Sequence, residues 1–97
     1  MTRKKNNSIE MRNIRKKIDA VDAKIIPLMV NRASLVNKAL ELKRKKTDII
    51  DLKRINQIKK KVSLHSKRLG GNPKLISEIW ESIIRNFINY EKKNFKK

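Results

Sequence analysis

The chain has 97 residues, of which 27 are Lys or Arg and 9 are Asp or Glu, so its formal net charge is +18. This length allows one domain with a small core. The sequence contains no Cys and one His, His65, which excludes disulfides, thiolate chemistry and metal sites rich in Cys or His. No apolar stretch is long enough to cross a membrane, and the first residues lack the apolar core of a secretory signal. We therefore expect a cytoplasmic protein.

The high positive charge raises the question of nucleic-acid binding, because basic surfaces attract phosphate without regard to sequence. Only 4% of the residues are aromatic, however, and no basic run alternates with aromatic side chains on which bases could stack. A basic helical protein that binds nucleic acid or a partner helix is therefore kept as the weaker, non-enzymatic alternative.

The first predicted element is a long helix from about Ser8 to about Arg44. Pro27 lies inside it and should kink the helix without ending it, because the apolar periodicity continues in phase beyond this residue. Apolar residues recur along the helix in steps of three and four. This apolar seam consists of Ile14, Ile18, Val21, Ile25, Leu28, Leu35, Ala39 and Leu42.

The first helix is too long to be covered by its own chain. About 35 residues of helix extend about 50 Å, whereas a compact chain of about 100 residues has a radius of gyration of about 13 Å. The remaining residues cannot cover the whole apolar seam, so we predict an obligate homodimer.

A second helix is predicted from Thr47 or Asp48, either of which can cap it, to about Lys67. We interpret His65 as an interior or edge histidine, because nothing near it in the sequence could share a metal. The inward seam of this helix consists of Asp51, Ile55, Ile58, Val62, His65 and Leu69.

A third helix is predicted from Pro73 to about Lys92. Gly70 and Gly71 close the preceding helix, Asn72 caps the next one, and Pro73 occupies its first turn. The inward side of the third helix consists of Ile76, Ile79, Trp80, Ile83, Ile84, Phe87 and Ile88.

These elements predict an all-α fold, a three-helix chain with one long N-terminal helix. We expect residues 1–97 to form a single helical domain, with basic, frayed tails at residues 1–7 and 93–97.

Arg32 interrupts the apolar pattern of the first helix. It continues the first seam between Leu28 and Leu35 and should face the interior, where it forms a structural ion pair, extends its charged end to the solvent at the edge, or binds an anionic ligand. Lys43 lies eleven residues later, close to three full turns, and projects from the same face. Arg15 is turned by about 100° and lies about 25 Å away along the axis, so it could reach the Arg32 pocket only from an antiparallel partner chain.

Two acidic positions carry further predictions. Asp51 and Arg54 are spaced as an ordinary surface pair. Glu91 lies one turn beyond Phe87 on the inward face of the third helix, unless the end of the helix frays and Glu91 is solvated. An ionised carboxylate has no proton to donate, so Glu91 could donate a hydrogen bond only when it is protonated. Burial favours that form and nearby cations oppose it, and the sequence leaves the balance open.

A family resemblance extends over about residues 9–92. Its motif is Ile14-Arg15-Lys16-Lys17-Ile18-Asp19-Ala20-Val21-Asp22, followed by Arg32, Lys43 and Asp51-Leu52-Lys53-Arg54. This combination resembles the all-helical (type II) chorismate mutase family. The resemblance implies an intertwined homodimer with two equivalent pockets, and a rearrangement of chorismate to prephenate that needs no metal and no cofactor.

The resemblance also implies roles for particular residues. Arg32 and Arg15 of the partner chain would bind the two carboxylates of the substrate. Lys43 and Glu91 would donate to the ether oxygen that becomes negative as the C–O bond breaks. The other implied substrate-binding residues are Asp51 near the ring hydroxyl, Arg54, Ile55 and Phe87.

Two positions depart from the family pattern. Ile55 stands where the family usually has a Glu that meets the substrate hydroxyl, and Phe87 stands where a small residue is common. Both features resemble isochorismate-pyruvate lyase relatives on the same fold, which expel pyruvate from isochorismate. We therefore predict a chorismate mutase, with isochorismate-pyruvate lyase as the first alternative and aminodeoxychorismate mutase as a weaker one.

Overall fold

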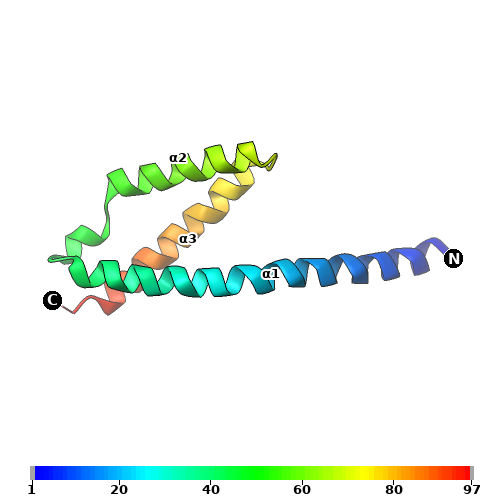
Figure 1. Ribbon diagram of the computed structural model, residues 1–97, viewed down its shortest axis with the longest axis horizontal. Helices are drawn as coiled ribbons and strands as arrows, with labels where there is room; N and C mark the ends of the chain where they lie inside the picture. The colour runs from blue at the N-terminus through cyan, green and yellow to red at the C-terminus, as the bar shows by residue number, and fades with distance from the viewer. Residues whose placement is uncertain (1, 97) are drawn as a thin grey trace. The chain divides into compact units, whose positions relative to one another are not determined.

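Three α-helices and one 3-10 turn make up the chain in the computed structural model, which describes the backbone of residues 2–96 and the side chains of residues 7–96. In chain order they are α1 (Thr2–Leu42), η1 (Lys46–Ile49), α2 (Leu52–Arg68) and α3 (Pro73–Asn94), as Figure 1 shows. Residues 2–96 contain no strand. The predicted all-α fold with a long N-terminal helix is confirmed.

The boundaries of α1 differ from the predicted ones at both ends. The helix begins at Thr2, before the predicted start at about Ser8, and continues through Pro27. It ends at Leu42, where the backbone N–H of Lys43 donates to the carbonyl of Leu40 at 3.1 Å. This bond spans only three residues, which tightens the last turn and leads the chain out of the helix.

The predicted start of the second helix at Thr47 or Asp48 is wrong. Both residues belong to η1, where the Asp48 carboxylate accepts a hydrogen bond from the backbone N–H of Lys45 at 3.0 Å. The residue that caps α2 is Asp51, whose carboxylate accepts from the backbone N–H of Arg54 at 3.1 Å. Several Asp and Thr residues in this stretch could each cap a helix, and the sequence pattern does not distinguish among them.

The corner between α2 and α3 agrees with the sequence. Gly70 has a φ of +75°, a left-handed conformation that glycine adopts without a steric penalty. The Asn72 side chain caps α3 by accepting from the backbone N–H of Leu75 at 3.2 Å, and Pro73 opens the helix. The predicted roles of glycine, Asn72 and Pro73 at the ends of these two helices are therefore confirmed.

The chain divides into two compact units, residues 1–34 and residues 35–97. We call them the N-terminal unit and the C-terminal unit. In the N-terminal unit, which is helical from Thr2 onward, none of the side chains described from residue 7 onward is buried. Its part of the apolar seam is exposed at Ile14, Ile18, Val21, Ile25 and Leu28.

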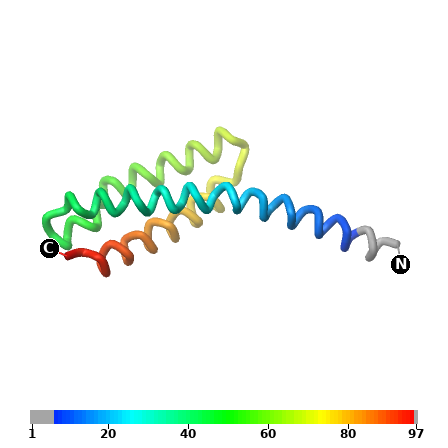
Figure 2. The backbone as a smooth tube through the Cα atoms, turned by 60° about the horizontal axis from the view of Figure 1, so that its bottom comes forward, coloured from blue at the N-terminus to red at the C-terminus, as the bar shows by residue number. Residues whose placement is uncertain are grey.

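The C-terminal unit contains the buried apolar residues among the described side chains, which are Leu40, Ile49 and Ile84. Here α2 lies against α3, and η1 lies against α3 as well. Figures 1 and 2 show that α2 leads away from the last turns of α1 and that α3 returns toward them. The end of α3 is thereby brought next to the residues that follow α1.

The buried stripe in the last turns of α1 is displaced by one residue from the predicted seam. Leu40 is buried and Val36 and Lys43 are half-buried, whereas the predicted seam residues are exposed. Those exposed residues are Leu35, Ala39 and Leu42. The apolar seam therefore does not mark the side of α1 that contacts α3 in the same chain.

Smaller corrections concern α2 and α3. Ser66 is buried near the end of α2, whereas His65 and Leu69 are exposed because the inward stripe continues from Val62 to Ser66. Ile79 is also exposed, although it was predicted on the inward side of α3. None of the described helices is long and apolar enough to cross a lipid bilayer.

Candidate active site

A partly buried ion pair joins the residue that follows α1 to the end of α3. The Lys43 ammonium lies 2.5 Å from Oε2 of Glu91, and the two side chains are 23% and 8% exposed. The residues are 48 positions apart in the sequence. The prediction that Glu91 faces inward is confirmed, and the alternative that it is solvated is wrong, because α3 continues past it to Asn94.

Helical spacing places Glu91 on the inward side of α3. Ile84 is buried and Phe87, Ile88 and Glu91 follow it at steps of three, four and seven, so all four residues share one face of the helix. An acid at the end of an apolar stripe is costly to bury unless a cation meets it. Lys43 supplies that cation, and the pair forms a polar centre within the C-terminal unit.

A second polar contact lies beside this pair. The Tyr90 hydroxyl donates a hydrogen bond to Oδ1 of Asn37 at 2.8 Å, which again joins α3 to the last turns of α1. The sequence analysis did not identify this contact. Neither residue interrupts an apolar stripe, so the hydrophobic pattern carries no signal for it.

Asp51 and Arg54 lie at the start of α2, and both are exposed. The predicted position of Asp51 on an inward seam is wrong, because its carboxylate caps the helix at the backbone N–H of Arg54. Their contacts with a substrate remain predictions.

Ile55 and Phe87 are both half-buried. Ile55 lines a hollow of about 290 Å³ between α2 and α3. Ile84 and Ile88 also line this hollow, together with charged residues that include the exposed pair of Lys59 and Glu81 at 3.7 Å. The lining of the hollow is therefore partly apolar and partly charged.

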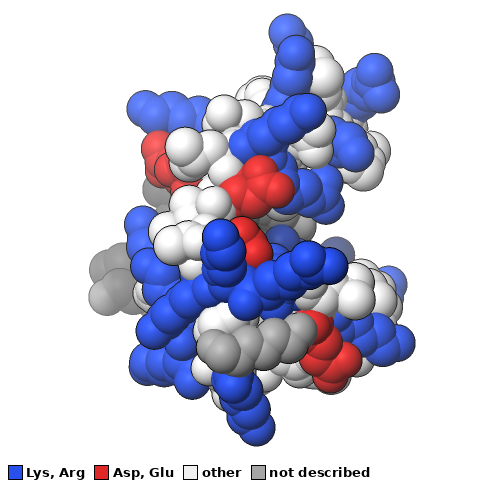
Figure 3. Space-filling model, turned by 90° about the vertical axis from the view of Figure 1, so that its left-hand side faces the viewer, with Lys and Arg blue, Asp and Glu red and all other residues white. Residues whose placement is uncertain are grey.

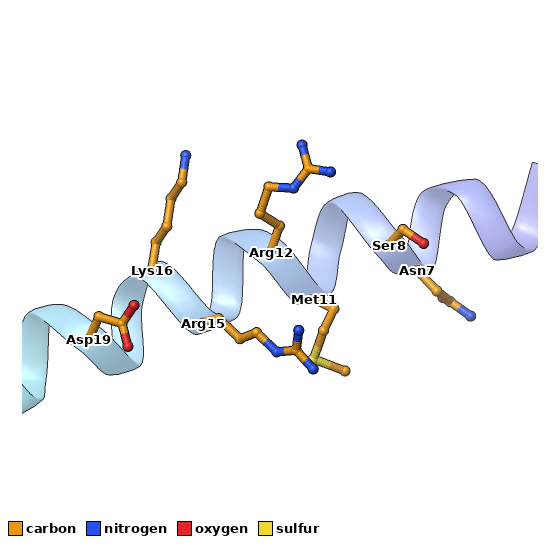
Figure 4. A pocket seen from close by; sticks show the side chains of 7 residues that line it. All are labelled: Asn7, Ser8, Met11, Arg12, Arg15, Lys16 and Asp19. Atoms are coloured by element: carbon orange, nitrogen blue, oxygen red, sulfur yellow. The ribbon is translucent and has the colours of Figure 1, made fainter.

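The two predicted carboxylate-binding arginines of the first helix belong to the N-terminal unit. Arg32 is half-buried, and Arg15 is exposed. Figure 4 shows Arg12 and Lys16 projecting from one side of α1, whereas Arg15 and Met11 project from the other side. Arg15 lines a shallow hollow on the surface of α1, together with residues between Asn7 and Asp19. It remains a prediction that one pocket contains Arg15, Arg32 and Lys43.

The charge around the end of α1 is strongly positive. Lys43 is followed by Arg44, Lys45 and Lys46, all exposed. Figure 3 looks onto this side of the molecule and shows Lys and Arg side chains over much of the face, with few acidic ones among them. A field of this sign attracts anionic ligands. Among the described residues, no group of three His, Cys, Asp or Glu is placed to hold a metal ion.

Comparison with protein families gives one decisive result. The chain matches the family chorismate mutase type II over residues 14–92. It belongs to this family. All the predicted site residues, from Arg15 to Glu91, lie within the matched range.

Membership of the chorismate mutase type II family classes the chain with isomerases. The all-helical architecture with a long first helix agrees with this result. Comparisons with curated proteins and with solved structures found no match.

Proposed function

We propose that the protein converts chorismate to prephenate. The reaction is a unimolecular rearrangement of a dianion, so it requires no nucleophile, no metal and no cofactor. The enzyme must hold the folded conformer of the substrate and stabilise negative charge on the ether oxygen. A rate acceleration of about 10⁶ requires about 8 kcal/mol of transition-state stabilisation, which a few fixed cations in a site that excludes water can supply.

The partly buried Lys43–Glu91 pair is the observation that supports this proposal most directly. An ammonium group has three N–H donors. One of them is used by Glu91, so Lys43 can turn another toward the ether oxygen of a bound substrate. Glu91 would donate to the same oxygen only after taking up a proton, because the ionised form that pairs with Lys43 has no proton to give and would repel the developing charge.

The arginines would bind the carboxylates of the substrate. In the proposed pocket, Arg32 binds one carboxylate and Arg15 of the other chain in a homodimer binds the second, because planar guanidinium groups form paired hydrogen bonds with carboxylates. Arg54 adds positive charge, and Asp51 lies near the ring hydroxyl. The exposed seam of the N-terminal unit, from Ile14 to Leu28, supports the dimer because so much apolar surface requires a covering partner.

Isochorismate-pyruvate lyase activity is the second candidate. The half-buried Ile55 and the apolar residues that line its hollow favour it, because an Ile offers no acceptor to a ring hydroxyl at that place. Phe87 further reduces the room for polar groups on the substrate ring. Aminodeoxychorismate mutase activity is less favoured, since an amine also needs an acceptor.

Incubation of the purified protein with chorismate and, separately, with isochorismate tests the proposal. We expect prephenate from chorismate. Pyruvate release from isochorismate, with chorismate left unchanged, would establish the second candidate instead. The Lys43→Ala variant, prepared in the same way, controls for contaminating enzymes and should be inactive on both substrates.

A further inference from the structure

The Tyr90–Asn37 hydrogen bond lies one residue away from the catalytic pair on α3. Consecutive residues of a helix point about 100° apart, so Tyr90 and Glu91 leave α3 in different directions. Tyr90 reaches Asn37 and Glu91 reaches Lys43, and both partners belong to the last turns of α1 or follow directly after them. Two bonds from adjacent residues therefore connect one turn of α3 to two points of the preceding segment.

The two points are well separated. Asn37 precedes Lys43 by six residues, which corresponds to about 9 Å along a helix. A rotation of α3 about its axis that moves Glu91 away from Lys43 also moves the Tyr90 hydroxyl away from Asn37. A slide of α3 along α1 stretches both bonds together. The Tyr90–Asn37 bond therefore fixes the rotation and the height of Glu91.

Apolar packing at this place is limited. Leu40 is the buried apolar residue in the last turns of α1, and Phe95, which follows α3, is half-buried. Both residues line an open hollow of about 330 Å³, together with Asn37, Glu41 and Tyr90. Because side chains do not fill this hollow, the Tyr90–Asn37 hydrogen bond adds a directional contact that apolar packing alone does not provide.

We propose that Tyr90 and Asn37 are positioning residues for the Lys43–Glu91 pair. Their role in turnover rests on the proposed chorismate mutase activity, whereas their effect on the ion pair does not. Loss of the Tyr90 hydroxyl lets the end of α3 rotate, and the Glu91 carboxyl then spends less time at the position from which it acts on the ether oxygen. A displacement of the Glu91 carboxyl that is much shorter than a hydrogen bond to the substrate is enough to lower turnover.

Two readouts on the dimeric full chain test this proposal. The first is kcat and KM for the Tyr90→Phe variant, which removes the hydroxyl and keeps the ring. We expect kcat to fall about tenfold while KM changes little, because the arginines that bind the carboxylates are not disturbed. Asn37→Ala should have the same effect, and the double variant should be no worse than either single variant, since both substitutions break the same bond.

The second readout does not depend on activity. The exchange of the Lys43 ammonium protons with water, followed by nitrogen-15 NMR, reports directly on the ion pair. We expect faster exchange in Tyr90→Phe, toward the upper limit given by Glu91→Ala. Asn94→Ala is the matched control, because Asn94 lines the same hollow and donates to the backbone carbonyl of Tyr90 at 2.8 Å, which is a hydrogen bond within α3. This control should keep both kcat and slow exchange.

The outcomes separate the two proposals. Wild-type exchange rates in Tyr90→Phe, or equal effects of Tyr90→Phe and Asn94→Ala, would overturn the positioning role whatever the activity. Faster exchange in Tyr90→Phe, together with no turnover of either substrate by the wild-type chain, would support the positioning role and overturn the proposed function.

Discussion

The two units of this chain use their apolar residues differently. In the N-terminal unit, none of the side chains described between residues 7 and 34 is buried, and Ile18 and Leu28 are 53% and 68% exposed. In the C-terminal unit, Leu40, Ile49 and Ile84 are each less than 9% exposed. Both units have regular helical patterns, so periodicity alone does not decide what covers an apolar stripe. The C-terminal unit covers part of its own stripe, whereas the N-terminal unit leaves its stripe exposed, which is the basis of the proposed dimer.

The largest expected effect comes from charging the exposed seam. Ile18→Lys combined with Ile25→Lys places four charges in a symmetric dimer. Burial of each Ile is worth about 1.5–3 kcal/mol, so the pair of substitutions should remove roughly 6–12 kcal/mol of association free energy. We expect dissociation at micromolar concentration by analytical ultracentrifugation, and loss of at least a hundredfold in activity if the two chains share the active site.

Ile26→Lys is the matched control for the seam. Ile26 is adjacent to Ile25 and is 62% exposed, but it lies off the seam. This variant should remain dimeric, and like the wild-type chain it should unfold at a temperature that rises with protein concentration. A fully active, monodisperse monomer of the wild-type chain would contradict the dimer and the shared active site together.

The next largest effect concerns the cations. Lys43→Ala and Arg32→Ala should each lower kcat at least a hundredfold, as loss of a preorganised donor does in other enzymes. Lys61→Ala removes an exposed lysine of α2 that lines none of the hollows described above, and it should change kcat less than twofold. Steady-state kinetics on purified variants measures both effects. Equal losses for Lys43→Ala and Lys61→Ala would mean that neither lysine acts at the reacting oxygen.

Mixed dimers extend this prediction to the shared site. Random exchange between Arg15→Ala and Arg32→Ala chains makes half of the dimers mixed, and each mixed dimer has one intact pocket. Activity should recover to about a quarter of the wild-type value. Absence of recovery after exchange has been verified would show that Arg15 does not act in the partner's pocket.

A smaller and more specific effect concerns the donor at position 91. A carboxyl group can donate to the ether oxygen only when it is protonated, whereas an amide always carries N–H donors. Glu91→Gln should therefore keep or raise kcat at neutral pH, and Glu91→Ala should lower it, because only the Gln variant retains a donor. Glu78→Gln changes an exposed acid of the same helix and should leave kcat unchanged. Equal kcat values for the wild-type enzyme, Glu91→Gln and Glu91→Ala would exclude Glu91 as the donor.

The smallest expected effect concerns the cap of α2. Asp51→Ala removes the acceptor of the Arg54 backbone N–H and should lower the free energy of unfolding by about 1 kcal/mol, measured by urea denaturation. Asp51→Asn retains an acceptor and should be nearly neutral. A rise in KM for Asp51→Asn without a change in stability would show that the carboxylate also contacts the substrate.

Much of the fold could be predicted because local chemistry determines it. At the corner from Gly70 to Pro73, glycine, a capping Asn and proline each have one favourable position, and the structure follows them. The start of α2 was mispredicted because Thr47, Asp48 and Asp51 are all suitable caps. Contacts with distant residues distinguish these caps. Ile49 is buried, and η1, to which it belongs, lies against α3.

In the candidate site, too, features that local chemistry determines could be predicted, whereas features that depend on distant contacts could not. Glu91 was detectable because an acid in an apolar stripe is costly, and that cost implies a cation nearby. Its direct contact with Lys43 follows from the tertiary arrangement of α1 and α3. Tyr90 and Asn37 gave no signal at all, since polar residues at exposed positions are ordinary.

The 48-residue separation between Lys43 and Glu91 has a consequence for the order of folding. The corner between α2 and α3 closes over a few residues, whereas the ion pair closes a loop some ten times longer, at an additional entropic cost of roughly 2 kcal/mol. The hairpin of α2 and α3 should therefore form early, and the ion pair late. A partly folded chain would already contain α2 and α3, about half of its helical residues, while lacking the Lys43–Glu91 pair, so recovery of activity should lag behind recovery of helical signal during refolding.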